Sequence, residues 1–142
     1  MSASQGTAVV TGASSGIGAI YADRLAKRGY DLILVARNEE RLKDVAARIT
    51  GASGRSVTIL PANLNDKASL AKVESVLKQN TAVTMLVNNA GFGSAVPLLQ
   101  SDIGKMVDMI DLNVTALTRL AYAAAPAFAS RGKGTIINIS SI

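Results

Sequence analysis

A glycine-rich segment lies near the beginning of the chain, where Gly12, Gly16 and Gly18 follow the apolar run Thr7–Thr11. Glycine permits a tight turn and lets a ligand approach the backbone closely, and a helix start adds free N–H groups and a partial positive charge. No acidic residue occurs before Asp23, which suits an anionic ligand. The segment therefore predicts a phosphate-binding loop, and a plain glycine-rich turn between a strand and a helix is the alternative.

Further polar residues follow apolar runs later in the chain. Arg37 comes directly after the run 31–36, and its planar, permanently charged guanidinium suits a phosphate, unless it is only a solvated surface arginine. Asn63 and Asn89 follow two later runs, and their amides can bind a ligand or satisfy nearby backbone groups. The pair Ser140–Ser141 follows the last run, where polar residues often form turns.

Cysteine and histidine are both absent from the 142 residues. Their absence excludes disulfides, thiol chemistry, cysteine-based zinc sites and any serine–histidine pair, and we expect no metal site. Without histidine, Ser141 is no conventional triad nucleophile. Any chemistry must therefore use hydroxyls, amides, lysine, arginine, carboxylates or a bound cofactor.

Apolar runs and helical periodicity predict an alternating order of elements. Strands are expected at 7–11, 31–36, 56–60, 83–87 and 134–140. Helices are expected from Ile17 to Arg28, after the N-caps Asn38 and Asp66, and from an N-cap at Ser101 to about Ala129. A loop is expected at 51–54, and Pro126 is expected to bend or end the last helix.

Strands that alternate with helices predict βαβ units, and hence an α/β fold with a doubly wound parallel sheet and helices on both faces. In this architecture a ligand lies outside the carboxyl ends of the strands. The glycine-rich segment, Arg37, Asn63, Asn89 and Ser141 all follow predicted strands. We therefore expect these residues to lie at the same end of the sheet.

Asn113 falls on a predicted apolar stripe of the long helix, formed by Met106, Ile110, Leu117 and Ala124. A buried amide left unpaired costs about 1–3 kcal/mol, so this side chain needs partners. The residues alone leave two interpretations open. The amide satisfies a neighbouring stretch of backbone, or it serves a functional site.

Together these motifs resemble the classical short-chain dehydrogenases/reductases (SDR). The resemblance rests on Thr11–Gly18, Asn88–Gly91, Asn113 and Ile139–Ser141, which occur in the family's order along the whole chain. It implies a Rossmann-like fold and an oxidoreductase that transfers hydride between a nicotinamide and a small-molecule carbonyl or alcohol substrate. It also implies a homo-oligomer at full length, with the long helix as a subunit interface, although packing on the sheet explains the apolar stripe of this helix equally well.

The resemblance also implies roles for individual residues. Cofactor contacts are expected from Gly12, Ser14, Ser15, Gly16, Ile17, Gly18, Arg37, Asn63, Leu64, Asn89, Ala90 and Gly91. Asn113 is expected to organise a water relay near a catalytic lysine, and Ser141 to orient the substrate carbonyl or alcohol. Arg37 favours NADP over NAD, because an acid at this place would contact the ribose hydroxyls of NAD. Asn63 replaces the family's usual aspartate and leaves the adenine contact uncharged.

The family's proton donor, a tyrosine in a Tyr-x-x-x-Lys motif, has no counterpart in these residues. The positions four residues after Tyr21, Tyr30 and Tyr122 hold Leu25, Leu34 and Pro126. We therefore expect residues 1–142 to form one NAD(P)-binding domain, truncated after the fifth strand, that lacks the C-terminal part with this motif and is catalytically incomplete. The alternative is a non-catalytic dinucleotide-binding protein, either a sensor or a partner subunit.

Charge and hydropathy exclude several other classes. Fifteen basic and ten acidic residues give a net charge of +5, but the basic residues are scattered and aromatic residues make up only 4%. This argues against a nucleic-acid partner. The uncharged stretches 1–22 and 81–101 are interrupted by glycine, asparagine or proline, unlike a signal peptide or a membrane helix. We expect a soluble, cytoplasmic protein without a membrane partner.

Overall fold

The computed structural model describes residues 3–141. Within them, five parallel strands form one sheet in the order β3-β2-β1-β4-β5. The strands are β1 (Thr7–Thr11), β2 (Asp31–Ala36), β3 (Val57–Pro61), β4 (Val83–Asn88) and β5 (Thr135–Asn138). The chain moves outward from β1 to β3 and then returns to place β4 on the other side of β1. This reversal marks the point where open α/β sheets bind their ligands.

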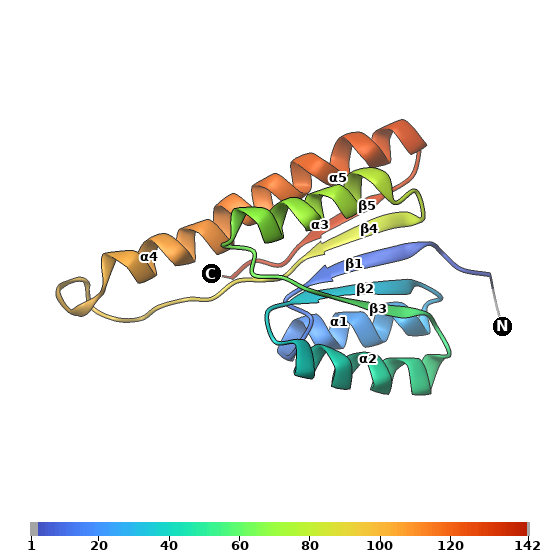
Figure 1. The fold of residues 1–142 in the computed structure, drawn as a ribbon, viewed down its shortest axis with the longest axis horizontal. Coiled ribbons are helices and arrows are strands. Elements are labelled where there is room, and N and C mark those ends of the chain that lie inside the picture. Colours follow the sequence, from blue (N-terminus) through green and yellow to red (C-terminus); the bar gives the residue numbers. More distant parts are fainter. Residues whose placement is uncertain (1–2, 142) are drawn as a thin grey trace.

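Helices cover both faces of the sheet (Figure 1). On one face lie α1 (Gly16–Lys27) and α2 (Glu39–Ser53), and on the other lie α3 (Lys67–Gln79) and α5 (Leu117–Arg131). The expected Rossmann-like doubly wound sheet is therefore confirmed. The observed strand limits differ from the expected ones by two residues or fewer.

The sheet separates two apolar cores. Along β1, Ala8 and Val10 pack on the face of α1 and α2, whereas Val9 packs on the face of α3 and α5. All three side chains are fully buried. Because the central strands are covered on both sides, they read in the sequence as unbroken apolar runs.

Side-chain caps fix the beginnings of two helices that follow strands. Asn38 Oδ1 accepts a hydrogen bond from the Arg41 backbone N–H at 3.0 Å, and an Asp66 carboxylate oxygen accepts one from the Ser69 backbone N–H at 2.9 Å. Both predicted N-caps are confirmed. The hydrogen bond from the Ser69 backbone is the main reason why the pKa of the exposed Asp66 carboxyl is lowered.

The loop expected at 51–54 is wrong, because α2 continues to Ser53. Gly51 keeps a helical backbone, and Ser53 Oγ donates a hydrogen bond to the Ile49 carbonyl at 2.7 Å. The helix ends only at Gly54, whose φ of +68° favours glycine. The second glycine of the segment, and not the first, therefore sets the helix end.

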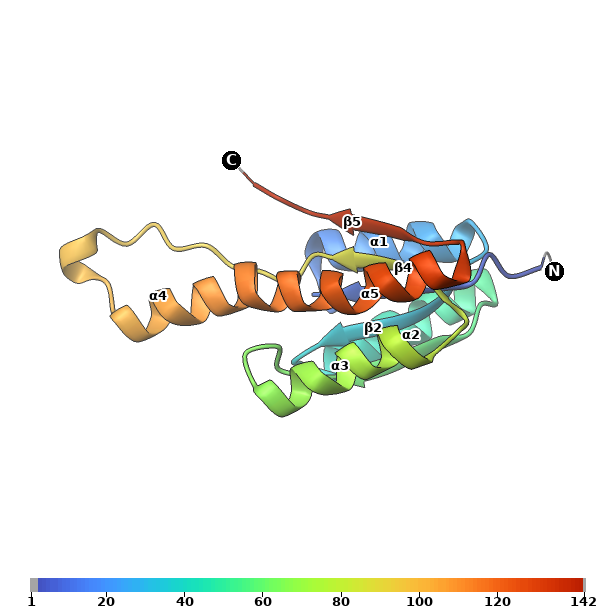
Figure 2. The same cartoon turned by 90° about the horizontal axis from the view of Figure 1, so that it is seen from above.

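One long helical rod extends beyond the end of the sheet, as Figure 1 and Figure 2 show. It consists of α4 (Ile103–Ile110), the π-helical segment η2 (Asp111–Ala116) and α5, and it follows the short 3-10 turn η1 (Leu98–Gln100). None of the helices within residues 3–141 combines the length and the apolar character that crossing a bilayer requires.

Three details of this rod correct the expectations. Its N-cap is Asp102, which accepts from the Lys105 N–H at 3.1 Å, and not Ser101, whose hydroxyl donates to the Leu98 carbonyl. Pro126 does not end the helix. It leaves the Tyr122 carbonyl without a backbone donor, but Pro126 is exposed and Tyr122 is 78% exposed. Water can therefore satisfy that carbonyl.

The third correction concerns the predicted apolar stripe of the rod, which does not form one buried face. Ala124 is buried, but Ile110 is 51% exposed and Met106 and Leu117 are half-buried. Two features break the stripe: α4 lies beyond the sheet, and η2 changes the helical repeat between α4 and α5.

Candidate functional site

A hollow of about 600 Å³ opens at the carboxyl ends of the strands β1 to β4. Its lining consists of the segments that follow these strands, the last two residues of β2 and one residue of η2: Gly12, Ser14, Val35, Ala36, Arg37, Asn38, Ala62, Asn63, Leu64, Asn65, Ala90, Gly91, Phe92 and Leu112. The hollow thus lies where the strand order reverses. We take it as the candidate site.

The structure brings together only some of the residues selected from the sequence. Seven of them line the hollow: Gly12, Ser14, Arg37, Asn63, Leu64, Ala90 and Gly91. Seven others do not: Ser15, Gly16, Ile17, Gly18, Asn89, Asn113 and Ser141. Of these, the run from Ser15 to Gly18 continues the loop into α1, Asn89 and Asn113 support the loops, and Ser141 is an exposed residue after β5.

Close contacts explain two of the glycines. Gly12 has a φ of +64°, and a Cβ there would lie 2.8 Å from Asn89 Nδ2 and 3.0 Å from the Ala90 Cα. A Cβ at Gly18 would overlap the Gly12 carbonyl and lie 2.6 Å from Asn89 Nδ2. The glycine-rich loop is therefore packed directly against the segment that follows β4, with no room for side chains.

Thr11 joins these two segments, and it is not among the site residues predicted from the sequence. The residue is 1% exposed, and its Oγ1 accepts hydrogen bonds from the backbone N–H groups of Asn89 and Ala90, both at 3.0 Å. Asn89 Nδ2 in turn donates to the carbonyls of Thr11 and Gly12, both at 3.2 Å. The signal in the sequence that points to Thr11 is a hydroxyl residue at the end of an apolar strand, directly before Gly12.

A second polar contact links the ends of β4 and β5. Asn88 is 3% exposed, and its Nδ2 donates to Asn138 Oδ1 at 3.1 Å and to the Leu117 carbonyl at 3.5 Å. The first of the two adjacent asparagines therefore braces β4 against β5 and α5, whereas Asn89 braces β4 against β1.

The Asn113 side chain satisfies a neighbouring stretch of backbone, which is one of the two interpretations left open by the sequence. Its Oδ1 accepts from the Phe92 N–H at 3.0 Å, and its Nδ2 donates to the Phe92 carbonyl at 2.7 Å. A Cβ on Gly91 would lie 2.8 Å from the same Oδ1. Asn113 thus holds Gly91 and Phe92 at the edge of the hollow from the π-helical segment η2.

Asn65 is a further lining residue that is not among those predicted from the sequence. Its Nδ2 donates to the Asp108 carbonyl in α4 at 3.2 Å. Its Oδ1 is buried and has no hydrogen-bond partner among the residues that the structure describes. The segment after β3 is therefore tied to the long helical rod beside the hollow.

The electrostatics of the hollow favour an anion near Arg37. This arginine is exposed and forms no salt bridge with any residue from 3 to 141. The nearby carboxylates of Glu39 and Glu40 both pair with Lys43 Nζ at 3.3 Å. Within the same described range, no group of three or more acidic side chains is placed to hold a metal ion.

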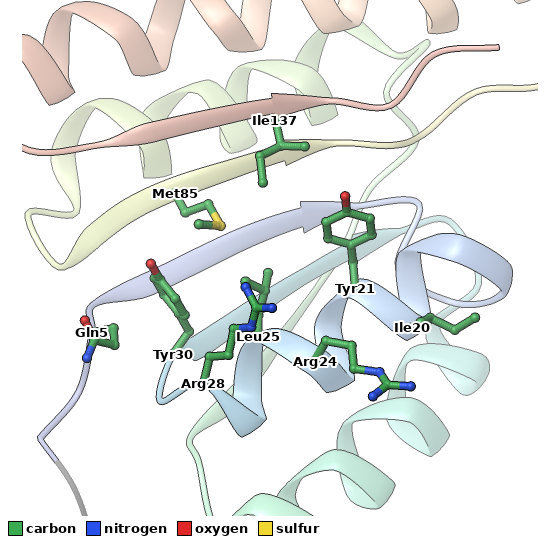
Figure 3. A pocket seen from close by; sticks show the side chains of 9 residues that line it. All are labelled: Gln5, Ile20, Tyr21, Arg24, Leu25, Arg28, Tyr30, Met85 and Ile137. Atoms are coloured by element: carbon green, nitrogen blue, oxygen red, sulfur yellow. The ribbon is translucent and has the colours of Figure 1, made fainter. Parts of the chain in front are cut away.

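Another hollow, of about 560 Å³, lies between α1 and the neighbouring face of β4 and β5 (Figure 3). Tyr21 and Leu25 from α1 face Met85 and Ile137 from the strands across it. It contains none of the residues selected from the sequence and lies on a face of the sheet instead of at the strand ends. We therefore do not take it as the candidate site.

Comparison with known proteins places this geometry in a family. The family model of short chain dehydrogenases matches residues 6–142. A very-long-chain 3-oxoacyl-CoA reductase from Anas platyrhynchos is 34% identical over 138 residues, which are 94% of this chain and 44% of that protein. The inactive hydroxysteroid dehydrogenase-like protein 1 of Homo sapiens is 36% identical over 137 residues, which are 94% of this chain and 41% of that protein.

A solved structure gives the same result at the level of the fold. The short-chain dehydrogenase from Sphingobium yanoikuyae in complex with NADPH is 47% identical and matches with a TM-score of 0.94, covering 96% of this chain and 54% of that one. The chain thus spans between 41% and 54% of the lengths of these three proteins. With a matching family model over nearly its whole length and a glycine-rich loop packed at the reversal of a parallel sheet, the chain belongs to the short chain dehydrogenase family.

Proposed function

We propose that residues 1–142 form the NAD(P)-binding Rossmann domain of an NADP-dependent oxidoreductase of the short-chain dehydrogenase type. The whole protein would transfer hydride between the nicotinamide and a carbonyl or alcohol substrate. The hollow at the ends of β1 to β4 carries this proposal, because it joins the glycine-rich loop, Arg37 and Asn63 in one continuous lining.

The described residues fit such a dinucleotide. The absence of side chains at Gly12 and Gly18 keeps the loop close to the segment after β4, and the start of α1 directs backbone N–H groups toward an anion. We assign the pyrophosphate to residues 12–18, the adenine amino group to Asn63 and Leu64, and the nicotinamide side to Asn89, Ala90 and Gly91. A bound nicotinamide nucleotide supplies the redox chemistry, and the chain binds and orients it.

Arg37 supports the choice of NADP over NAD. Its guanidinium is free of carboxylate partners in the described residues and lines the hollow directly after β2, where a 2′-phosphate is read in this fold. The solved relative from Sphingobium yanoikuyae is a complex with NADPH. NAD is the alternative cofactor.

Titration of the 142-residue chain with NADPH and with NADH, followed by nicotinamide fluorescence, tests the assignment. We expect tighter binding of NADPH by the wild type and of NADH by Arg37→Asp, because a carboxylate repels the 2′-phosphate and accepts from the ribose hydroxyls. If Arg37→Asp keeps the NADPH affinity, Arg37 does not read the phosphate. If neither nucleotide binds the wild type, the proposed function is wrong.

The catalytic roles of Asn113 and Ser141 belong to the whole protein. We propose that Asn113 organises a water relay near a catalytic lysine and that the Ser141 hydroxyl orients the substrate oxygen. The curated relative named a 3-oxoacyl-CoA reductase supports a carbonyl substrate. Turnover of carbonyl substrates by the whole protein tests these roles, with kcat falling in Ser141→Ala while NADPH affinity stays unchanged.

An exposed apolar surface on η1 and the rod supports a homo-oligomer of the whole protein. Its side chains are between 45% and 85% exposed: Leu98, Ile103, Val107, Ile110 and Val114. Surfaces of this kind mark interaction sites. Light scattering of the whole protein tests the assembly, and cell fractionation tests the proposed cytoplasmic location.

A non-catalytic dinucleotide-binding protein is the second candidate function. One relative, at 36% identity, is named an inactive dehydrogenase-like protein, whereas another, at 34% identity, is named a reductase. Relatives of similar identity thus include proteins with active and with inactive names. Nucleotide binding without turnover by the whole protein would favour this candidate, whereas NADPH oxidation with any carbonyl substrate would exclude it.

A further inference from the structure

A smaller hollow, of about 370 Å³, lies beside the candidate site and shares one residue with it. Its lining consists of Ser14, Ser15, Arg41, Asp44, Val45 and Arg48. Ser14 also lines the larger hollow, which contains Arg37. A group bound at Ser14 therefore has Arg37 in the larger hollow and two arginines, Arg41 and Arg48, in the smaller one.

The beginning of α2 fixes the position of Arg41. Arg37 precedes the N-cap Asn38, and Arg41 follows it within the first turn of the helix. The Asn38 side chain holds the Arg41 backbone N–H at 3.0 Å, so the backbone from which this side chain extends is anchored. Arg41, Val45 and Arg48 are spaced by four and three residues, which places them on the face of α2 that borders Ser14 and Ser15.

The charges around Arg41 leave it available for an anion. Arg37, Arg41 and Arg48 form no salt bridge with a described residue. Hydrogen bonds from Lys43 to Glu40 and Glu39 occupy those two carboxylates and raise the pKa of Lys43. Asp44 is the acidic residue that lines the smaller hollow, against two arginines.

From this arrangement we infer that Arg41 is a second specificity-determining residue for NADP. Its guanidinium binds the 2′-phosphate from the side of α2, Arg37 binds it from the side of β2, and the hydroxyls of Ser14 and Ser15 complete the set of donors. Arginine suits this task because it offers several N–H groups in one plane to a phosphate. The inference rests on the proposed dinucleotide site and extends it to a residue outside the lining of the main hollow.

Calorimetric titration with adenosine 2′,5′-bisphosphate and adenosine 5′-monophosphate isolates the 2′-phosphate, the one group in which these ligands differ. We expect Arg41→Ala to lower the affinity for the bisphosphate roughly tenfold, as for the loss of one charge-assisted hydrogen bond. Affinity for the monophosphate stays unchanged. Arg41→Lys keeps the charge without the planar donor pair, and its effect is expected to be intermediate.

Arg28→Ala is the matched control, since it removes one positive charge from the C-cap of α1 at the hollow shown in Figure 3, away from Ser14. We expect it to change neither affinity. Arg41→Ala retains the fold because Arg41 is exposed, its cap uses only the backbone N–H, and alanine favours helices. Circular dichroism of each variant checks this.

The other outcomes overturn the inference in distinguishable ways. If Arg37→Ala loses the preference for the bisphosphate and Arg41→Ala keeps it, Arg41 does not read the phosphate and the proposed function stands. If Arg41→Ala weakens both ligands equally, the residue acts on a group other than the 2′-phosphate. If the wild type binds neither ligand, the inference and the proposed function both fail.

Discussion

The Asn113 side chain binds both polar backbone groups of Phe92. Asn113 Oδ1 accepts from the Phe92 N–H at 3.0 Å, and Asn113 Nδ2 donates to the Phe92 carbonyl at 2.7 Å. One residue of η2 thereby holds the segment after β4, which contributes Gly91 and Phe92 to the candidate site. The helical rod and the binding hollow are coupled at this point.

We expect Asn113→Ala to lower the free energy of unfolding by about 1–3 kcal/mol, because two hydrogen bonds to the exposed Phe92 residue are lost, at about 0.5–1.5 kcal/mol each. Denaturant titration measures this. Hydrogen exchange of the Phe92 amide gives the local readout and should accelerate. Asn113→Asp is the control, since it keeps the acceptor and should protect that amide. An unchanged Phe92 exchange rate in Asn113→Ala would contradict the contact.

Replacing Thr11 tests the link between β1 and β4. Thr11→Val leaves the half-buried N–H groups of Asn89 and Ala90 without their acceptor, which costs about 0.5–1.5 kcal/mol for each lost hydrogen bond. Thr11→Ser keeps the hydroxyl and should cost about 1 kcal/mol for the lost methyl group. Urea denaturation compares the two variants, and equal stability would mean that the hydroxyl is not needed.

Two glycines in helices should respond to alanine in opposite directions. Gly18→Ala places a Cβ against the Gly12 carbonyl, and the overpacking should cost about 1–3 kcal/mol and weaken nucleotide binding. Gly51→Ala places its Cβ in open space within α2 and should stabilise the chain by about 0.5–1 kcal/mol. Thermal unfolding measures both, and a stabilised Gly18→Ala would refute the close packing of the loop.

The Asp66 cap predicts a dependence of stability on pH. Its folded-state pKa lies below the reference value of 3.8, so the carboxylate stabilises the fold above that pH, and this contribution disappears as the pH falls through the lower, folded-state pKa. Asp66→Asn keeps a capping oxygen without the charge. The melting temperature of the wild type should exceed that of the variant at pH 7, and the difference should vanish in acid. A constant difference would contradict the assignment.

The order of helices and strands was predictable because each element depends on a pattern of residues that are close in the sequence. Strands buried on both faces appear as continuous apolar runs, and the caps Asn38 and Asp66 precede periodic apolar residues. Helix ends were less predictable. Gly51 and Gly54 look alike in the sequence, and only the left-handed backbone of Gly54 distinguishes them.

The site was predictable as a set of segments and not as a set of side chains. Because parallel strands end at the same edge, position after a strand was enough to select Arg37 and Asn63. The direction in which a side chain points could not be predicted from its position after a strand. Asn89 follows a strand as Asn63 does, yet its amide turns back to the carbonyls of Thr11 and Gly12. Such hydrogen bonds depend on which strands become neighbours.

The π-helical segment η2 makes the number of residues in the long rod as important as their types. Each helical residue advances the chain by about 100° and about 1.5 Å, and a π turn contains about one residue more than an α turn. Deleting a single residue within Asp111–Ala116 would therefore rotate α4 by about 100° about its axis relative to α5. It would also move Asn113 or its neighbours off the Phe92 backbone. Relatives of this chain should thus tolerate substitutions in this segment more readily than insertions or deletions.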